Sequence, residues 1–117
     1  MAPFPESHEV SASRILANYF KTDVYFVKRS SNIKTADIKI GNIYWEIKSP
    51  KGDGKRTIQN NLRVADGQSP NLIVDMRRSK MHIRRAEGRI RQFLTEGHTK
   101  FKRVLLIKKD EKIVVIK

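Results

Sequence analysis

Residues 36–48, ADIKIGNIYWEIK, contain two short runs of alternating hydrophobic and polar residues joined by Gly41 and Asn42. Alternation with a period of two predicts β-strands, and a two-residue connection with glycine first predicts a tight hairpin with a type II′ turn. The turn pairs Ile40 with Ile43, and this pairing sets the register of both strands. The segment therefore requires a sheet whose core face carries the isoleucines and the tryptophan of this hairpin.

In this register Asp37 faces Glu46 across the two strands, and Lys48 follows on the same face. Like charges directly opposite each other destabilise a sheet, so something must offset their repulsion. Two carboxylates about 5 Å apart can hold one Mg²⁺, and a lysine beside them can activate the attacking water or balance charge on phosphorus. We therefore predict that Asp37, Glu46 and Lys48 are catalytic, with both carboxylates as metal ligands if the reaction needs a cation. The alternative is that Lys39 and Lys48 only neutralise two acids on a solvated face.

Hydrophobic periodicity predicts the other elements. Helical spacing covers 7–20, with Ser7 as the N-cap, and also 55–66 and 81–94, whereas strands are predicted at 23–29, at 71–76 and on both sides of Asp110 within 104–117. The predicted order is α-β-β-β-α-β-α-β-β in one domain, 1–117. This order indicates an α/β fold with a central mixed sheet flanked by helices.

The charge of the chain indicates its class of partner. Against 12 Asp and Glu stand 25 Lys and Arg, a formal charge of +13 on 117 residues. Such self-repulsion in a small domain favours a polyanionic partner, and nucleic acid is the expected one. No apolar run approaches the roughly 20 residues of a membrane span, and the absence of cysteine is compatible with a reducing cytosol. We expect a soluble protein that acts in the cytoplasm and does not bind membranes.

The loop that follows Lys48 is a candidate phosphate-binding segment. Its sequence, SPKGDGKRT, places Lys51 and Lys55 among glycines ahead of a predicted helix, and Thr57 near the start of that helix. Backbone amides at a helix N-terminus and mobile lysines both attract anions. The spacing is not that of a P-loop, which argues against a nucleotide hydrolase. We predict that Lys51, Lys55 and Thr57 bind substrate.

Three further side chains are candidates for substrate binding. Arg77 and Arg78 follow a strand that should lie near the acidic hairpin, and arginine is suited to bidentate contact with phosphate. Tyr44 lies on the polar face of the hairpin and can stack on a base, whereas Trp45 belongs to the core. Four arginines of the last predicted helix are expected to make non-specific contacts with phosphates: Arg84, Arg85, Arg89 and Arg91.

The pattern D-x8-E-x-K formed by Asp37, Glu46 and Lys48 occurs between one helix and one αβ unit. This arrangement resembles the αβββαβ core of the PD-(D/E)XK nuclease superfamily over residues 7–76. The sequence departs from the superfamily pattern because no proline precedes Asp37 and the motif lies on an unusually tight hairpin. The resemblance implies a metal-dependent nuclease with a PD-(D/E)XK-like core.

A second resemblance covers most of residues 33–117. The run WEIKSPKGDGKRTIQNNL, followed by QSPNLIVDMRR, is similar to the C-terminal tRNA-nuclease toxin domains of contact-dependent growth inhibition proteins and to related polymorphic and phage toxin domains. The matching residues are Asp37, Trp45 to Pro50, Gly52, Gly54, Lys55, Thr57, Ile58, Gln68, Ser69, Asn71, Asp75, Arg77 and Arg78. This resemblance implies cleavage of tRNA and a cognate immunity protein, which should be acidic because the chain is basic.

The resemblance leaves the use of metal open. Some toxin nucleases, of the barnase, EndoU, colicin and RelE-like group, cleave RNA without metal by using the 2′-hydroxyl as the nucleophile. Glu46, Lys48 and the basic residues named above are of the types that this route needs. The three histidines, His8, His82 and His98, are expected to be surface residues.

We therefore interpret the chain as a ribonuclease, with tRNA as the favoured substrate, that cleaves phosphodiester bonds at Asp37, Glu46 and Lys48. Mg²⁺ is the expected cofactor if the mechanism is metal-dependent. Two alternatives remain. One is a metal-dependent DNase of restriction or repair type, and the other is a basic nucleic-acid-binding protein without catalysis, in which the acidic pair is structural.

Overall fold

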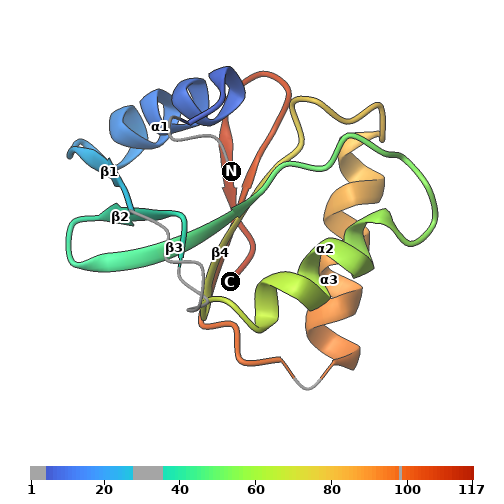
Figure 1. Cartoon of the computed structure of the whole chain (residues 1–117). Helices are drawn as coiled ribbons and strands as arrows, with labels where there is room; N and C mark the ends of the chain where they lie inside the picture. The colour runs from blue at the N-terminus through green and yellow to red at the C-terminus, as the bar shows by residue number, and fades with distance from the viewer. Residues whose placement is uncertain (1–4, 28–35, 98) are drawn as a thin grey trace.

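The computed structural model describes residues 5–27, 36–97 and 99–117 (Figure 1). Its elements follow the predicted order α-β-β-β-α-β-α-β-β. They are α1 (Ser7–Phe20), β1 (Val24–Phe26), β2 (Ile38–Ile40), β3 (Ile43–Lys48), α2 (Thr57–Asp66), β4 (Asn71–Asp75), α3 (Ile83–Glu96), β5 (Arg103–Ile107) and β6 (Ile113–Val115). The chain is thus a single mixed α/β domain, as the periodicity predicts.

The sheet has six strands in the spatial order β1-β2-β3-β4-β5-β6. The central strands β3, β4 and β5 are parallel, and the outer strands on both sides run antiparallel to their neighbours. The parallel pairs are joined through α2 and α3, which is the crossover that parallel strands require. The mixed sheet is therefore confirmed, and the αβββαβ order covers α1 to β4. The assignment to the PD-(D/E)XK superfamily remains a prediction.

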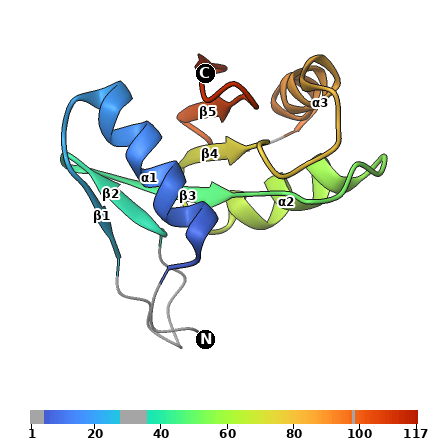
Figure 2. The same cartoon turned by 90° about the horizontal axis from the view of Figure 1, so that it is seen from above.

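Helices cover both faces of the sheet (Figure 2). On one face α1 packs through Leu16 against Trp45 and Ile73. On the other face α2 and α3 pack against Leu72 and Val74. Because successive residues of a strand point to opposite faces, β4 contributes to both cores, and all five of its residues are buried. The burial of Trp45, whose ring contacts Phe20, confirms that it is a core residue.

The β2–β3 hairpin has the predicted register. Its pairs are Ile40 with Ile43, Lys39 with Tyr44, and Ile38 with Trp45. Gly41 has φ +60°, which the first turn position of a type II′ turn requires and which glycine adopts without strain. The described ladder ends at the third pair, because the Asp37 amide donates to the Trp45 carbonyl at 3.0 Å. The Asp37 amide thus bonds to Trp45, the residue before Glu46, whereas simple extension of the register pairs Asp37 with Glu46.

Element boundaries differ from the sequence prediction where a side chain caps a helix. The N-cap of α1 is Glu6, and the predicted Ser7 is wrong by one residue, because the Glu6 amide donates to Glu9 Oε1 at 2.9 Å. His82 caps α3, accepting from the Arg84 amide at 3.2 Å. The predicted strand 23–29 is observed as β1, and its last two residues, together with His98, lie outside the described residues.

Candidate active site

Asp37 and Glu46 lie close together where β2 meets the middle of β3. Asp37 immediately precedes β2, and its Oδ2 accepts a hydrogen bond from the Ile47 amide at 3.0 Å. Only 9% of Asp37 and 2% of Glu46 is exposed. The two acids therefore do not lie on a solvated face, where lysine and water would be enough to neutralise them. They form a buried acidic pair inside a basic protein.

Lys48 forms an ion pair with Glu46. Its Nζ lies 3.2 Å from Glu46 Oε2, and 19% of its side chain is exposed. Glu46 and Lys48 pair in register with Leu72 and Val74 of β4, so both point to the sheet face that α2 and α3 cover. The structure thus brings the three predicted catalytic residues together in one cluster, which we call the acidic site: Asp37, Glu46 and Lys48.

The acidic site changes the protonation of Glu46. Burial of its carboxyl group and the nearby negative charge of Asp37 raise the pKa of Glu46 to about 7, against the opposing effect of Lys48. A hydrogen bond between the two carboxyl groups also holds the proton. A group with a pKa near neutrality can both accept and donate a proton at working pH, which a general acid or base requires.

One oxygen of the acidic site has no hydrogen-bond partner within the described part of the chain. It is Glu46 Oε1, which is buried. A buried acceptor in this state is costly unless water, an ion or a ligand contacts it. Two carboxylates, one of them with this available oxygen, match the oxygen ligands of Mg²⁺, which usually binds one or two carboxylates and keeps several waters. Asp37 and Glu46 are therefore chemically suited to hold that cation.

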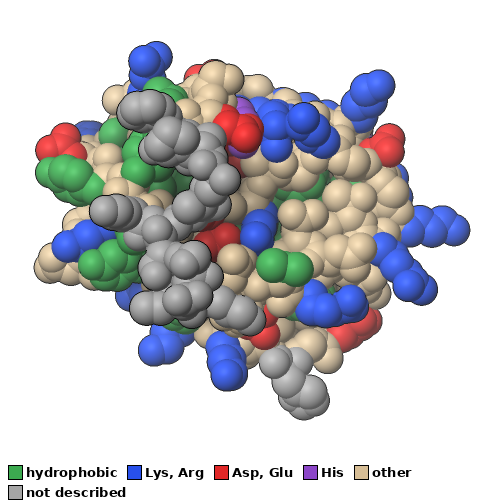
Figure 3. Space-filling model, viewed as in Figure 1, with side chains coloured by type: hydrophobic (Ala, Val, Ile, Leu, Met, Phe, Trp, Pro, Cys, Tyr) green, Lys and Arg blue, Asp and Glu red, His purple; other side chains and the backbone are tan. Residues whose placement is uncertain are grey.

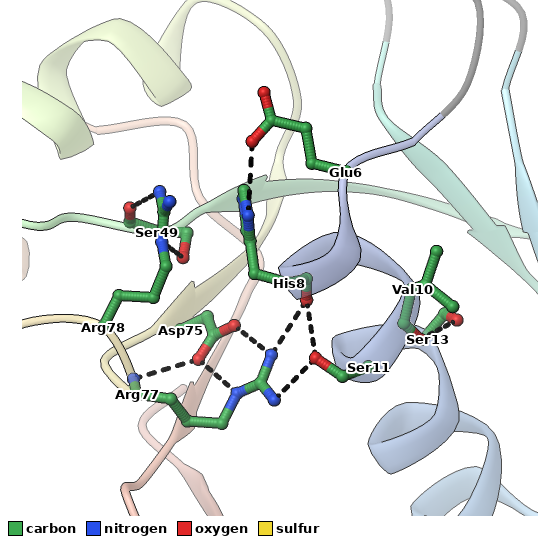
Figure 4. A network of polar contacts seen from close by, with 9 residues as sticks. All are labelled: Glu6, His8, Val10, Ser11, Ser13, Ser49, Asp75, Arg77 and Arg78. Atoms are coloured by element: carbon green, nitrogen blue, oxygen red, sulfur yellow. Dashed lines mark hydrogen bonds and ion pairs between the residues drawn. The ribbon is translucent and has the colours of Figure 1, made fainter.

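Arg78 contacts the chain at the end of β3. Its Nε donates to Ser49 Oγ at 3.1 Å and its Nη2 donates to the Ser49 carbonyl at 2.8 Å. Ser49 directly follows Lys48, so these bonds fix a second cation beside the strand that carries the acidic site (Figure 4). The predicted role of Arg78 in binding phosphate stays a prediction.

Arg77 is positioned differently. Its guanidinium forms a bidentate ion pair with the buried Asp75, through Nε to Oδ1 at 2.9 Å and Nη2 to Oδ2 at 2.7 Å. It also donates to Ser11 Oγ and to the His8 carbonyl in the first turns of α1 (Figure 4). The hydrogen bond to Asp75 is the main cause that raises the pKa of Arg77.

The neighbours of Asp75 place this ion pair on the α1 side of the sheet. Asp75 pairs in register with Ile107, which packs in the α1 core, whereas Glu46 and Lys48 point to the other side. Arg77 thus connects α1 to β4. Its predicted role at the scissile phosphate stays a prediction, and its contacts favour a structural role.

The loop between β3 and α2 is fixed at its base and exposed at its lysines. Ser79 Oγ donates to the Gly52 carbonyl at 2.8 Å, and Arg89 Nη1 donates to the Lys55 carbonyl at 3.0 Å. A side chain at Gly52 would come within 3.1 Å of Thr57 Oγ1, so the loop packs closely on the first turn of α2. Lys51 and Lys55 extend into solvent from the end of β3 that carries Lys48. Their position leaves them available to phosphates.

Tyr44 lies two residues before Glu46 on β3 and therefore on the same face. Half of Tyr44 is exposed (50%), and Lys39 Nζ lies 5.6 Å from the centre of its ring. An exposed aromatic ring beside a cation is a suitable stacking platform for a base. The structure thus places this predicted substrate-binding residue next to the acidic site.

Residues 34–113 match the family model described as "Contact-dependent growth inhibition CdiA C-terminal domain". The chain belongs to this family. Among solved structures it is similar to a "CdiA-CT/CdiI toxin and immunity complex from Burkholderia pseudomallei", with a TM-score of 0.70 and 21% identity over 100% of this chain and 92% of that one. At this identity the likeness concerns the fold. None of the curated proteins matches the chain.

Membership of the CdiA C-terminal domain family makes the chain a toxin domain of contact-dependent growth inhibition. All three residues of the acidic site fall within the matched range, whereas α1 precedes it. No helix in the described ranges is long and apolar enough to span a bilayer.

Two features of this CdiA C-terminal domain are not evident from its sequence. The contact of Ser49 with Arg78 is one of them, because Ser49 belongs to the matching run Trp45 to Pro50 but nothing in that run indicates its partner. Glu6, His8 and Glu9 bring their ligand atoms within 4.8 Å of one another at the start of α1. The helix-capping bond between Glu6 and Glu9 and the 3.3 Å contact of His8 Nδ1 with Glu6 Oε2 account for this second cluster.

Proposed function

We propose that this CdiA C-terminal domain is a nuclease that cleaves phosphodiester bonds in RNA at the acidic site, with tRNA as its favoured substrate. The observation that carries the proposal is the buried contact of Asp37, Glu46 and Lys48, in which Glu46 has a pKa of about 7 and an oxygen without a partner among the described residues. Burying two acids against each other costs stability, and a catalytic role accounts for their retention. The preference for tRNA rests on the resemblance of the sequence to tRNA-cleaving toxin domains.

The surface supports a polyanionic substrate. The chain carries a formal charge of +13, and Lys and Arg side chains extend from many parts of the face in Figure 3. Such a surface attracts nucleic acid from solution and neutralises its phosphates. The acidic site then forms a small negative region within a basic surface that binds the substrate.

Each residue of the acidic site has a defined task in this proposal. Glu46 accepts a proton from the nucleophile, which is either water or the 2′-hydroxyl group of the RNA, because its pKa lies near neutrality. Lys48 donates to the phosphate oxygens and stabilises the charge that develops on them. Asp37 holds the β3 backbone through the Ile47 amide and keeps the pKa of Glu46 high. A divalent cation held by Asp37 and Glu46 would supply Lewis acidity at the same phosphate.

Cleavage assays test the proposal directly. The protein is incubated with total tRNA, plasmid or single-stranded DNA, each with Mg²⁺ or with EDTA. We expect cleavage of tRNA, and we expect Glu46→Gln to abolish it. Glu87→Gln, which changes an acid of α3 paired with Arg91, is the matched control and should cleave normally. Equal activity of the two variants on every substrate would remove the acidic site from the mechanism.

The αβββαβ order of α1 to β4 favours a second candidate, a metal-dependent DNase. In the same assay this function predicts cleavage of plasmid with Mg²⁺ and none with EDTA, together with intact tRNA. Binding of all substrates without cleavage would instead identify a nucleic-acid-binding protein whose acidic pair is structural.

We also propose that the domain acts in the cytosol of a target cell and has an acidic immunity protein. The fold it shares with one half of a toxin and immunity complex supports this partner, and the basic surface predicts the charge of the partner. Induced synthesis of the domain in bacteria without an immunity protein should stop growth, whereas Glu46→Gln should be harmless. Unimpaired growth at high levels of the active protein would contradict the toxin assignment.

A further inference from the structure

A cavity of about 640 Å³ opens beside Tyr44, where β3, β4 and β5 begin. Its walls come from Val27 after β1 and Ala36 before β2, from the β2–β3 turn, from the connection between α2 and β4, and from the first residue of β5. The predicted site residues do not include the polar groups on two of these walls, which are Gln68, Asn71 and Arg103. The volume is in the range of sites that enclose small organic ligands.

Hydrogen bonds hold the floor of this cavity in place. The buried Asn71 donates from Nδ2 to the Tyr44 carbonyl at 2.9 Å, and its Oδ1 accepts from Arg103 Nη1 at 3.1 Å. Ser69 Oγ accepts from the Asn71 amide at 3.1 Å. Asn71 therefore connects β3, at Tyr44, to the guanidinium of Arg103 on β5. These bonds fix the distance between the two sides of the cavity.

Gln68 contributes a polar atom that is unpartnered within the described ranges. Its Oε1 is buried and has no hydrogen-bond partner in the ranges that the structure describes. An unsatisfied buried acceptor is costly, and a small rotation of the half-buried Gln68 side chain would let a ligand in the cavity donate to it and remove this cost. The exocyclic amino groups of adenine, cytosine and guanine are donors of this kind, and amide side chains pair with base edges in two hydrogen bonds.

The other groups at the cavity are suited to a nucleotide. Tyr44 presents a half-exposed ring on which a base can stack, and Arg103 supplies a cation for a phosphate or a base acceptor. Tyr44 and Glu46 point to the same face of β3 about 7 Å apart, the rise of two residues in a strand. A nucleotide in the cavity would therefore be close to the phosphate that the acidic site cleaves.

We propose that this cavity is a specificity subsite that binds one unstacked nucleobase of the RNA substrate, with Gln68 reading the base edge and Arg103 contacting its nucleotide. The inference rests on the proposed nuclease function. Single-stranded loops are where proteins read RNA sequence, because their bases can leave the stack and expose their edges. The subsite would thus select which phosphodiester bond of a loop reaches the acidic site.

The test measures binding apart from cleavage. In the Glu46→Gln background, the affinities of the four ribonucleoside 5′-monophosphates are compared by isothermal titration calorimetry. We expect one base to bind at least about fivefold more tightly than the others, as one good pair of hydrogen bonds to a base edge provides. Gln68→Leu should abolish this preference, because it keeps the bulk of the side chain and removes both polar atoms.

Gln92→Leu is the matched control, since Gln92 lies exposed on α3 and contacts only Glu96 among the described residues. It should leave the preference intact. Equal affinities for the four nucleotides, no binding of any of them, or a preference that survives Gln68→Leu would each overturn the subsite.

The outcome is independent of the cleavage assay. If the protein cleaves RNA but shows no base preference that depends on Gln68, the subsite is refuted and the nuclease function is still supported. A Gln68-dependent preference in a protein that cleaves nothing would refute the nuclease and leave the nucleobase site. If Gln68→Leu instead weakens only binding of an immunity protein, the cavity is a protein interface and the proposal is wrong.

Discussion

Lys48 Nζ lies 3.2 Å from Glu46 Oε2, yet the pKa of Glu46 stays raised at about 7. The lysine therefore offsets only part of the effects of burial and of Asp37. This balance predicts opposite shifts for two variants. Lys48→Met should raise the pKa of Glu46 further, and Asp37→Asn should lower it. Carbon-13 NMR titration of the Glu46 carboxyl group measures both, and shifts in the same direction would contradict the assigned causes.

Glu46→Gln should make the fold more stable at high pH. The pKa of Glu46 is 4.5 in the unfolded reference and about 7 in the fold. As pH rises between these values, the unfolded chain loses its proton first, so stability falls across this window and stays low above it. The cost is a few kcal/mol at about 1.4 kcal/mol per pKa unit. The glutamine side chain of the variant carries no charge and avoids this cost.

Thermal unfolding of the wild type and of Glu46→Gln at about pH 8.5 and about pH 4 checks this sign. We expect a higher Tm for the variant at the higher pH and similar values at the lower pH. A variant that is less stable at both pH values would show that Glu46 is held mainly by its bond to Lys48.

Trp45→Ala should destabilise the domain by roughly 3 to 5 kcal/mol, as truncation of a large buried aromatic side chain usually does. Trp45 is 3% exposed and packs in the α1 core with Ile38 and Leu16. Urea unfolding monitored by far-ultraviolet circular dichroism measures the loss. Trp45→Phe, which keeps most of the buried area, is the control and should lose much less.

The alternation of residues 36–48 was enough to predict the hairpin, its three observed pairs and the approach of Asp37, Glu46 and Lys48. Local patterns carry this information because the register of a two-residue hairpin leaves one choice of faces. Burial of the acidic pair could not be predicted in this way. It depends on α2 and β4, which pack beside β3 from positions distant in sequence.

The two adjacent arginines show the same limit. Arg77 and Arg78 are indistinguishable by sequence, but Arg77 is held by Asp75 and α1 whereas Arg78 is held by Ser49. The Gln68 cavity was also beyond prediction, because its walls come from segments that are far apart in the sequence, from Val27 to Arg103.

This difference between the arginines leads to a further prediction. Arg77→Ala leaves the fully buried Asp75 without its ion pair and should cost roughly 3 to 5 kcal/mol of stability. Arg78→Ala should leave stability nearly unchanged and lower the single-turnover rate of RNA cleavage at saturating substrate. Chemical denaturation measures the stability of both variants, and single-turnover assays measure their cleavage rates. A stable Arg77→Ala protein with a reduced cleavage rate would support the predicted role of Arg77 at the scissile phosphate.

Exposed arginines of α3 should contribute to binding without affecting the chemical step. Arg91 is paired with Glu87 and Arg89 donates to the Lys55 carbonyl, so Arg84 and Arg85 are the better test. Each phosphate contact adds about 0.9 to the slope of log affinity against log salt, so the double alanine variant should flatten that slope by at most about two.

The matched control for this pair is the double variant Lys109→Ala/Lys112→Ala, which removes the same charge from the β5–β6 turn. Fluorescence anisotropy with labelled tRNA at several salt concentrations gives both slopes. The single-turnover rate at saturating tRNA should not change in either variant, because groups that only track phosphates bind substrate and transition state equally. Equal flattening by both pairs would mean that α3 holds no preferred path for the RNA and that the charge of the whole surface supplies the affinity.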